Sequence, residues 1–208
     1  MNHANHYEEL YEKWRGIYLA MDRAELKERF HLRADSGAHY ITYYQQEYRL
    51  DQQDGSLTLC SDPNRRVSFH MAVSIYTLFH YAKPDAFVCG RFVPFREVKR
   101  AAPFDPAFQR TIVAPFCKTF NGHADLLRRA CERLGGQSVQ RGDVGYIIHA
   151  FDWMPVMMIF WDGDDEFDAQ ATLLFDANIT DFIHEESVVG IGADLVRRLR
   201  EEAGLSEG

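Results

Sequence analysis

The chain has 208 residues, 46 % of them apolar, which is enough to build a sizeable core and argues against disorder. Its formal net charge of −8 would repel a phosphate backbone, so the composition disfavours nucleic acid as a partner. No apolar run approaches the roughly 20 residues of a spanning helix, and the N-terminus is polar and charged. We therefore expect no membrane segment, no signal peptide and a cytoplasmic location.

Two helices are predicted at the start of the chain. The first is indicated by aromatic and apolar residues that recur at spacings of three and four: Tyr7, Leu10, Tyr11, Trp14 and Tyr18. The second covers residues 22–30, because Asp22 is a good N-cap and charged residues follow on one side. Residues 1–34 are therefore expected to form an N-terminal helical segment.

The pattern then changes from helix to strand. Residues 39–50 are rich in β-branched and aromatic residues, with a polar break at Gln45-Gln46. Asp54-Gly55 is a strong two-residue hairpin turn, since glycine accepts a positive φ without a Cβ clash. Residues 57–60 would form the returning strand of this early hairpin.

The clearest helix is predicted over residues 67–81, where an apolar stripe follows one face and Pro84 comes shortly after. The next segment, residues 87–95, is apolar. Pro94 then favours a short helix over residues 95–100, because proline is well suited to a first helical turn.

Two more helices are predicted before the chain returns to strands. Asp105 is expected to cap a helix that has Pro106 in its first turn and reaches about Phe120, although Pro115 should kink or split it. The other covers residues 123–134 and ends at Gly135-Gly136, in the manner of a helix C-cap.

The last third of the chain predicts an antiparallel meander of four short strands separated by polar turns: 137–140, 144–150, 155–161 and 167–175. A final helix is expected over residues 187–201. The sequence therefore predicts one α+β domain spanning residues 1–208. Its helical N-terminal two thirds would pack on a mainly antiparallel sheet, formed by the C-terminal strands plus the early hairpin.

An acidic turn between the last two strands is the first candidate site, with Asp162, Asp164, Asp165 and Glu166 close together in sequence. Such carboxylates are suited to a hard divalent cation. A calcium loop counted from Asp162 needs Gly at its sixth position and Glu at its twelfth, but these positions hold Phe167 and Leu173. The favoured interpretation is a solvated hairpin turn, in which the charges keep buried flanks soluble.

Asp176 and Asp168 form the second candidate. Asp176 ends a buried strand, which is a common place for a catalytic base or a ligand. It is also a turn former that bonds its own backbone in Asp-Ala-Asn178, and this interpretation is favoured.

Three histidines could titrate near neutral pH: His123, His149 and His184. No HExxH motif and no histidine pair at helical spacing occurs, so a structural role is favoured for each. His149 and His184 remain the histidine candidates for catalysis.

The four cysteines, Cys60, Cys89, Cys117 and Cys131, are widely spaced and form no CxxC motif. We therefore expect free thiols, no intrinsic metal cluster and no cofactor. Nucleophile motifs and a P-loop are missing, and Gly190-Ile-Gly192 lacks the context of a dinucleotide fingerprint.

The segment from Arg91 to Arg96 alternates aromatic rings with guanidinium groups and could hold an anion or a planar ligand. The favoured interpretation is a loop that Phe92 and Phe95 anchor to the core while the arginines pair with the acidic surface. If the domain binds a ligand, we expect Arg91, Arg96, Trp161 and Glu166 to contribute to the site.

Several short motifs together resemble an uncharacterised prokaryotic family, the domain of unknown function 3786. They are Asp54-Gly55, the segment Arg91 to Glu97, Leu134-Gly-Gly136, Asp143, Pro155, the segment Trp161 to Phe167, and Leu174-Phe175-Asp176. The resemblance covers about residues 35–200. It implies a soluble domain of anaerobic bacteria and archaea, with relatives beside iron–sulfur or corrinoid-linked modules. No activity is established for the family, so it assigns no catalytic residue.

Two hypotheses about function remain open. In the first, the chain is a binding or accessory domain that holds a protein partner or a small-molecule ligand without chemistry. In the second, it is a metal-assisted hydrolase or lyase. The second would use Asp162, Asp164, Glu166 and Asp176, with His149 or His184. Whether the chain is an enzyme is left open by the sequence.

Overall fold

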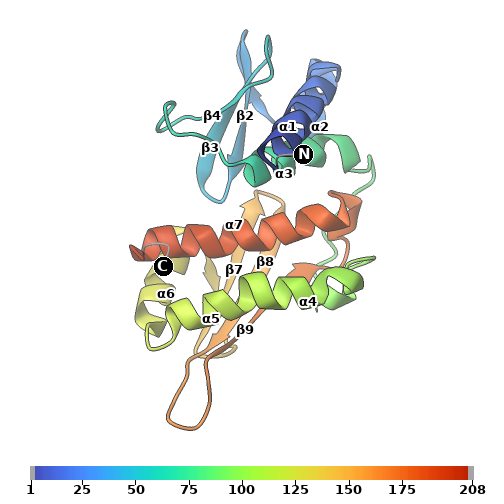
Figure 1. Ribbon diagram of the computed structural model, residues 1–208. Helices are drawn as coiled ribbons and strands as arrows, with labels where there is room; N and C mark the ends of the chain where they lie inside the picture. Colours follow the sequence, from blue (N-terminus) through green and yellow to red (C-terminus); the bar gives the residue numbers. More distant parts are fainter. Residues whose placement is uncertain (1–2, 206–208) are drawn as a thin grey trace.

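The computed structural model describes residues 3–205, and side chains from residue 8 onward. Figure 1 shows an early sheet with α1, α2 and α3 in the upper part of the view, and a second sheet behind α4, α5 and α6 in the lower part. The last helix, α7 (Glu185–Ala203), lies between them. Helices and two antiparallel sheets make up the chain, so the predicted α+β class is confirmed.

The first two helices form as predicted. They are α1 (His3–Leu19) and α2 (Arg23–Arg29). Asp22 caps α2, because its Oδ1 accepts a hydrogen bond from the Glu25 backbone N–H at 2.8 Å. Trp14 and Tyr18 of α1 are buried, whereas the side chain of Tyr7 lies outside the described part of the chain.

The early strands form a sheet of their own and do not extend the C-terminal one. Its order is β1 (Arg33–Ala34), β2 (Ala38–Tyr43), β3 (Gln46–Asp51) and β4 (Leu57–Leu59), all antiparallel. Asp54-Gly55 lies in the β3–β4 connection with Gly55 at φ 74°, in line with the predicted turn. The two sheets are linked by a hydrogen bond of 2.8 Å from the Tyr44 N–H to the Ala150 carbonyl.

The third helix, α3 (Phe69–Tyr81), begins two residues later than predicted, because Ser68 caps it by accepting from the Met71 N–H. The following short elements are β5 (Phe92–Pro94), η1 (Phe95–Glu97) and η2 (Ala102–Phe104). The predicted helix over 95–100 is therefore a single 3₁₀ turn.

Pro115 does not break the next helical run. The run consists of α4 (Asp105–Phe108), the π-helical segment η3 (Gln109–Val113) and α5 (Ala114–Phe120). Pro115 follows directly after the π turn, in which the Ala114 N–H bonds the Gln109 carbonyl five residues back, and this wide turn accommodates the residue that lacks an N–H. Asp105 is the first residue of α4 and makes no capping bond, contrary to expectation.

The predicted meander is confirmed. After α6 (Ala124–Arg133) come β6 (Gln137–Ser138), β7 (Val144–Phe151), β8 (Met154–Trp161) and β9 (Gln170–Asp176). The strand order is β5-β9-β8-β7-β6, so β5 joins the far edge from earlier in the chain. A short turn, η4 (Ile179–Asp181), leads into α7.

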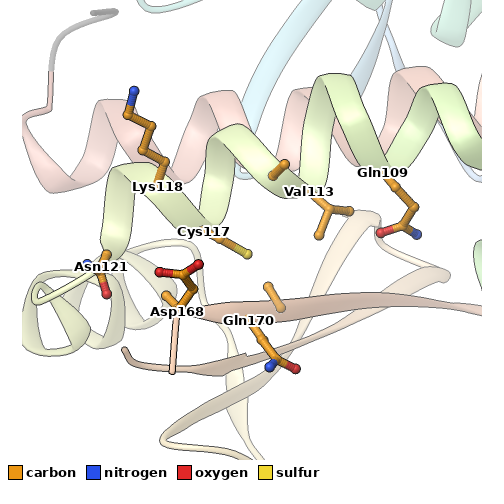
Figure 2. Close-up of a pocket in the computed structure, with 10 residues that line it drawn as sticks. Gln109, Val113, Cys117, Lys118, Asn121, Asp168 and Gln170 are labelled. Atoms are coloured by element: carbon orange, nitrogen blue, oxygen red, sulfur yellow. The ribbon is translucent and has the colours of Figure 1, made fainter. Parts of the chain in front are cut away.

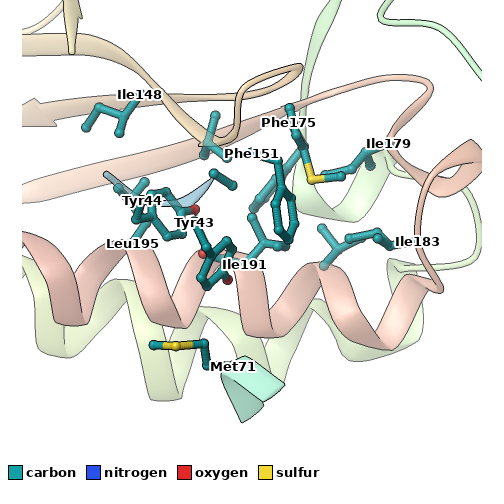
Figure 3. Packing of buried hydrophobic residues seen from close by; sticks show 14 of the residues in the cluster. Tyr43, Tyr44, Met71, Ile148, Phe151, Phe175, Ile179, Ile183, Ile191 and Leu195 are labelled. Carbon is teal, nitrogen blue, oxygen red and sulfur yellow. The ribbon is translucent and has the colours of Figure 1, made fainter. Parts of the chain in front are cut away.

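The core lies between the C-terminal sheet, α7 and the early sheet. Figure 3 shows Phe151 and Phe175 from the sheet packed with Ile191 and Leu195 of α7. All four are at most 1 % exposed. No helix within residues 3–205 is both long and apolar enough to cross a bilayer.

Candidate functional site

A pocket of about 590 Å³ lies between the helical run η3–α5 and the beginning of β9 (Figure 2). We call it the helix–strand pocket. Its helical wall contains Gln109, Val113, Cys117, Lys118 and Asn121. Its strand wall contains Asp168, Ala169, Gln170 and Ala171. The volume is in the range of small-molecule sites, and the lining mixes amide, charged and apolar groups.

The helical wall follows from sequence spacing. Gln109, Val113 and Cys117 are four residues apart and all point toward β9 in Figure 2. The opposite side of the helix is held by buried rings, since Phe116 packs against Phe160 of β8 with centroids 5.9 Å apart. The helix is therefore fixed on the sheet and presents a polar and thiol-bearing face to the pocket.

The strand wall is an open edge of β9. β5 pairs with β9 only at Leu174, Phe175 and Asp176, whereas β8 pairs with it from Gln170 to Phe175. Within residues 3–205, the start of β9 thus has a neighbouring strand on one side only. The pocket occupies the space that a longer β5 would fill.

Cys117 contacts this edge. Burial raises the pKa of its thiol above the usual 9.0, and the N–H groups of Cys117 and Ala171 oppose the shift without cancelling it. The thiol is therefore protonated at neutral pH, so Cys117 is a weak nucleophile.

The acidic turn is joined to the end of α5, beside the pocket residue Asn121, through backbone contacts. Asp162 Oδ1 accepts from the Gly122 N–H at 2.7 Å, just beyond the end of α5. Asn121 Oδ1 accepts from the Gly163 N–H at 3.2 Å. The Asp162 N–H in turn donates to Asp143 Oδ2 at 2.8 Å. Asp162 thus joins the loop to α5, a role that spacing along the sequence does not reveal.

The other acidic candidates organise the loop or face solvent. Asp164 Oδ1 accepts from the N–H groups of Glu166 and Phe167, each at 2.8 Å, and these bonds lower its pKa. Asp165 and Glu166 are exposed. Among the described residues, no three His, Cys, Asp or Glu side chains are grouped to hold a metal ion.

Asp176 is 2 % exposed and accepts backbone hydrogen bonds from two directions. The Asn178 N–H donates to its Oδ1 at 2.9 Å, which is the local turn contact expected from the sequence. The Gly90 N–H donates to its Oδ2 at 2.7 Å, and the Cys89 N–H lies at 3.2 Å from Oδ1. Asp176 thereby fixes the loop that precedes β5.

The two candidate histidines lie on different elements from Asp176. His149 is half-buried on β7, and β8 separates that strand from β9. His184 is the N-cap of α7, where its Nδ1 accepts from the Glu186 N–H at 3.3 Å. The structure thus places His184 in a capping role and does not bring it together with Asp176.

The four predicted ligand contacts are divided between the two ends of β9. Trp161 pairs with Gln170 at the start of the strand, and Phe92 pairs with Asp176 at its end. Six residues of strand span about 20 Å. Arg91 therefore lies far from Trp161 and from the exposed loop that carries Glu166. Arg96, beyond β5, lies 4.0 Å from Glu97, while the buried Phe95 stacks on Phe108 with centroids 4.3 Å apart.

The comparisons with known proteins give one match. The model of a family described as Domain of unknown function (DUF3786) matches residues 22–198. No curated protein and no solved structure matches the chain.

Proposed function

This chain belongs to the DUF3786 family, and we propose that it is a binding domain whose ligand enters the helix–strand pocket. The observation that carries the proposal is the pocket itself, with a volume of about 590 Å³ and polar side chains on both walls. These polar groups are Gln109 of η3, Asn121 at the end of α5, Asp168 just before β9, and Gln170 of β9. Amides and one carboxylate suit a small molecule or short peptide segment rich in hydrogen-bonding groups.

Catalysis in the helix–strand pocket has less support than ligand binding. The Cys117 thiol, which lines the pocket, keeps its proton because burial raises its pKa. Among the described residues, no histidine lines the pocket. Asp168 and Lys118 line it, but within residues 8–205 neither is hydrogen-bonded to the Cys117 thiol, so no activated nucleophile is assembled there.

The proposal is tested by blocking the pocket. Ala114 is exposed and lines it, so Ala114→Trp should fill the space without disturbing the core. Ala107→Trp adds the same ring to an exposed position outside the lining and serves as the control. A metabolite and peptide library is screened by NMR, and ligands should shift signals of residues 109–121 and 168–171.

Binding should be lost in Ala114→Trp and kept in Ala107→Trp. Ligands whose shifts map elsewhere would count against the pocket, and turnover of a substrate by the purified chain would replace the binding proposal with an enzymatic one.

We also propose, from the family resemblance, that the domain acts beside a separate iron–sulfur or corrinoid-linked protein. Its own four cysteines are free, with Cys117 on α5, Cys131 on α6 and the other two in separate loops, so the partner would supply the metal centre. Co-purification under anaerobic conditions, followed by iron and cobalt analysis, should recover such a partner. Recovery of the chain with neither metal would contradict the idea.

The alternative proposal is a metal-assisted hydrolase or lyase. It has weaker support, because Asp162 Oδ1 and Asp164 Oδ1 each already accept two backbone hydrogen bonds. Protein purified without chelator would contain a bound metal if this alternative were correct. Its melting temperature would also rise on addition of calcium, magnesium or manganese.

A further inference from the structure

A smaller cavity lies where β3, the loop before α3 and the last turns of α7 meet. Its volume is about 140 Å³, and Arg65, Arg66 and Arg197 line it. We propose that this arginine cavity binds the phosphate or carboxylate group of a small organic ligand. The site is separate from the helix–strand pocket, so its test does not depend on the function proposed above.

Arg197 supplies a buried donor that is not used by the protein. Its Nη1 donates to Glu201 Oε1 at 2.6 Å, and its Nε lies 3.4 Å from Asp194 Oδ1. Its Nη2 is buried and has no hydrogen-bond partner among the described residues. An unpaired buried N–H is unfavourable, so a small rotation of the guanidinium that turned Nη2 toward an anion bound in the cavity would be favoured.

The surrounding charge favours an anion. Glu201 is shared by three guanidinium groups, because Arg65 Nη2 lies at 2.8 Å and Arg198 Nη1 at 2.6 Å in addition to Arg197. Arg66 lines the same cavity, and no ion pair with it is found among the described residues. This cluster of arginines stands out in a chain whose net charge is −8.

Neutral groups complete the wall. Tyr48 donates its hydroxyl hydrogen to Gln46 Oε1 at 2.8 Å, which leaves the Gln46 amide hydrogens available to the cavity. Burial raises the pKa of Tyr48 to about 12, so this hydroxyl stays protonated. Ser68, the N-cap of α3, also lines the cavity, and the positive end of that helix adds to the attraction for an anion.

A groove of about 770 Å³ adjoins the cavity, since Arg65, Arg66 and Ser68 line both. Tyr11 and Phe69 line the groove and offer apolar surface to the body of the ligand. Glu8 and Glu12 line the groove as well, and they disfavour a second negative charge. The ligand class is therefore an organic molecule with one anionic group on an aromatic or aliphatic body.

The test titrates the full chain with four probes by calorimetry: phenyl phosphate, benzoate, inorganic phosphate and the neutral benzyl alcohol. We expect one or both organic anions to bind, and benzyl alcohol not to bind. The stronger of phenyl phosphate and benzoate identifies the anionic group. Raising the salt concentration should weaken binding.

Arg66→Gln should weaken binding of that anion by about tenfold, the loss expected for one charge-assisted contact. Arg66 is exposed, so the variant should keep the wild-type melting temperature. Arg91→Gln, on the exposed loop before β5, is the matched control and should bind as the wild type does. The proposal is overturned if neither organic anion binds at millimolar concentration, if benzyl alcohol binds equally well, or if both variants bind alike.

Discussion

The hydroxyl of Tyr43 donates a hydrogen bond of 2.9 Å to Asp194 Oδ2, which joins β2 to α7 across 151 residues of sequence. Its neighbour Tyr44 donates to the Ile191 carbonyl at 2.8 Å, one turn earlier on the same helix. The ring of Tyr43 also packs on Phe151 of β7, with centroids 4.8 Å apart. These adjacent tyrosines connect the early sheet, α7 and the C-terminal sheet (Figure 3).

Replacing Tyr43 with Phe should destabilise the protein by about 1–3 kcal/mol, because the buried Asp194 carboxylate loses a hydrogen-bond donor. The free energy of unfolding is measured by urea denaturation. Tyr40→Phe is the control, since that hydroxyl donates to the solvent-exposed Asp35 at 2.7 Å and should matter less. Equal losses in the two variants would show that burial of the Tyr43 contact is unimportant.

The stability contributed by Asp194 should fall as pH rises. Burial raises its pKa above the usual 3.8, and this effect outweighs the opposing charge of Arg197 and the bond from Tyr43. The folded state therefore binds a proton more tightly than the unfolded state, and that advantage is lost between pH 3.8 and the folded pKa. In urea denaturation at a series of pH values, the stability of the wild type relative to Asp194→Asn should decrease across this window.

Glu201 provides a control, because its contribution to stability should change with pH in the direction opposite to that of Asp194. Burial alone would raise its pKa, but the hydrogen bonds and charges of Arg197 and Arg198 hold it below the usual 4.5. Its contribution is present above pH 4.5 and is lost as pH falls through the folded pKa. Glu201→Gln should therefore cost less stability at low pH, and slopes of the same sign for both variants would contradict this assignment.

The two early turns show what local sequence could predict. Asp54-Gly55 was predictable because its glycine accepts the positive φ that the turn requires. The sequence indicates the turn at Tyr44 and Gln45, with φ of 45° and 60°, only through the polar break at Gln45-Gln46, since neither turn residue favours that conformation. Tertiary contacts hold it: Tyr44 is fully buried and bonds both Ala150 and Ile191.

Gln45→Asn should therefore stabilise the protein by up to about 1 kcal/mol, because asparagine tolerates a left-handed conformation better than glutamine does. The side chain of Gln45 is exposed, so little packing is lost. Thermal denaturation provides the measurement. Gln46→Asn, in the extended strand β3, should give no gain. A gain at position 46 and none at 45 would mean that the turn carries no strain.

The candidate site was predictable only where its contacts are local. The four-residue spacing of Gln109, Val113 and Cys117 could have indicated one helix face, but nothing nearby shows that β5 stops at Pro94 and leaves the edge of β9 open. The turn contacts of Asp164 are local, since the N–H groups that its Oδ1 accepts from are two and three residues away. The bond from Gly90 to Asp176 spans 86 residues and depends on strand order, which the sequence did not provide.

Asp176 should prove essential for stability, because each of its oxygens accepts a backbone hydrogen bond in a buried setting. Asp176→Asn keeps the shape but replaces one acceptor oxygen with an NH₂ group that must face a donor. A loss of about 1–3 kcal/mol in the free energy of unfolding is expected from urea denaturation. Asp165→Asn, at an exposed position of the acidic turn, should change stability by less than about 0.5 kcal/mol.

The same pair of variants separates a structural from a reactive Asp176. If this carboxylate holds the loop before β5, hydrogen exchange of the Cys89 and Gly90 amides should accelerate in Asp176→Asn and stay unchanged in Asp165→Asn. If Asp176→Asn retained full stability and slow exchange at these amides, the Asp176 side chain would have no structural role. Asp176 would then return as a candidate for the acid–base role that its position at a strand end first suggested.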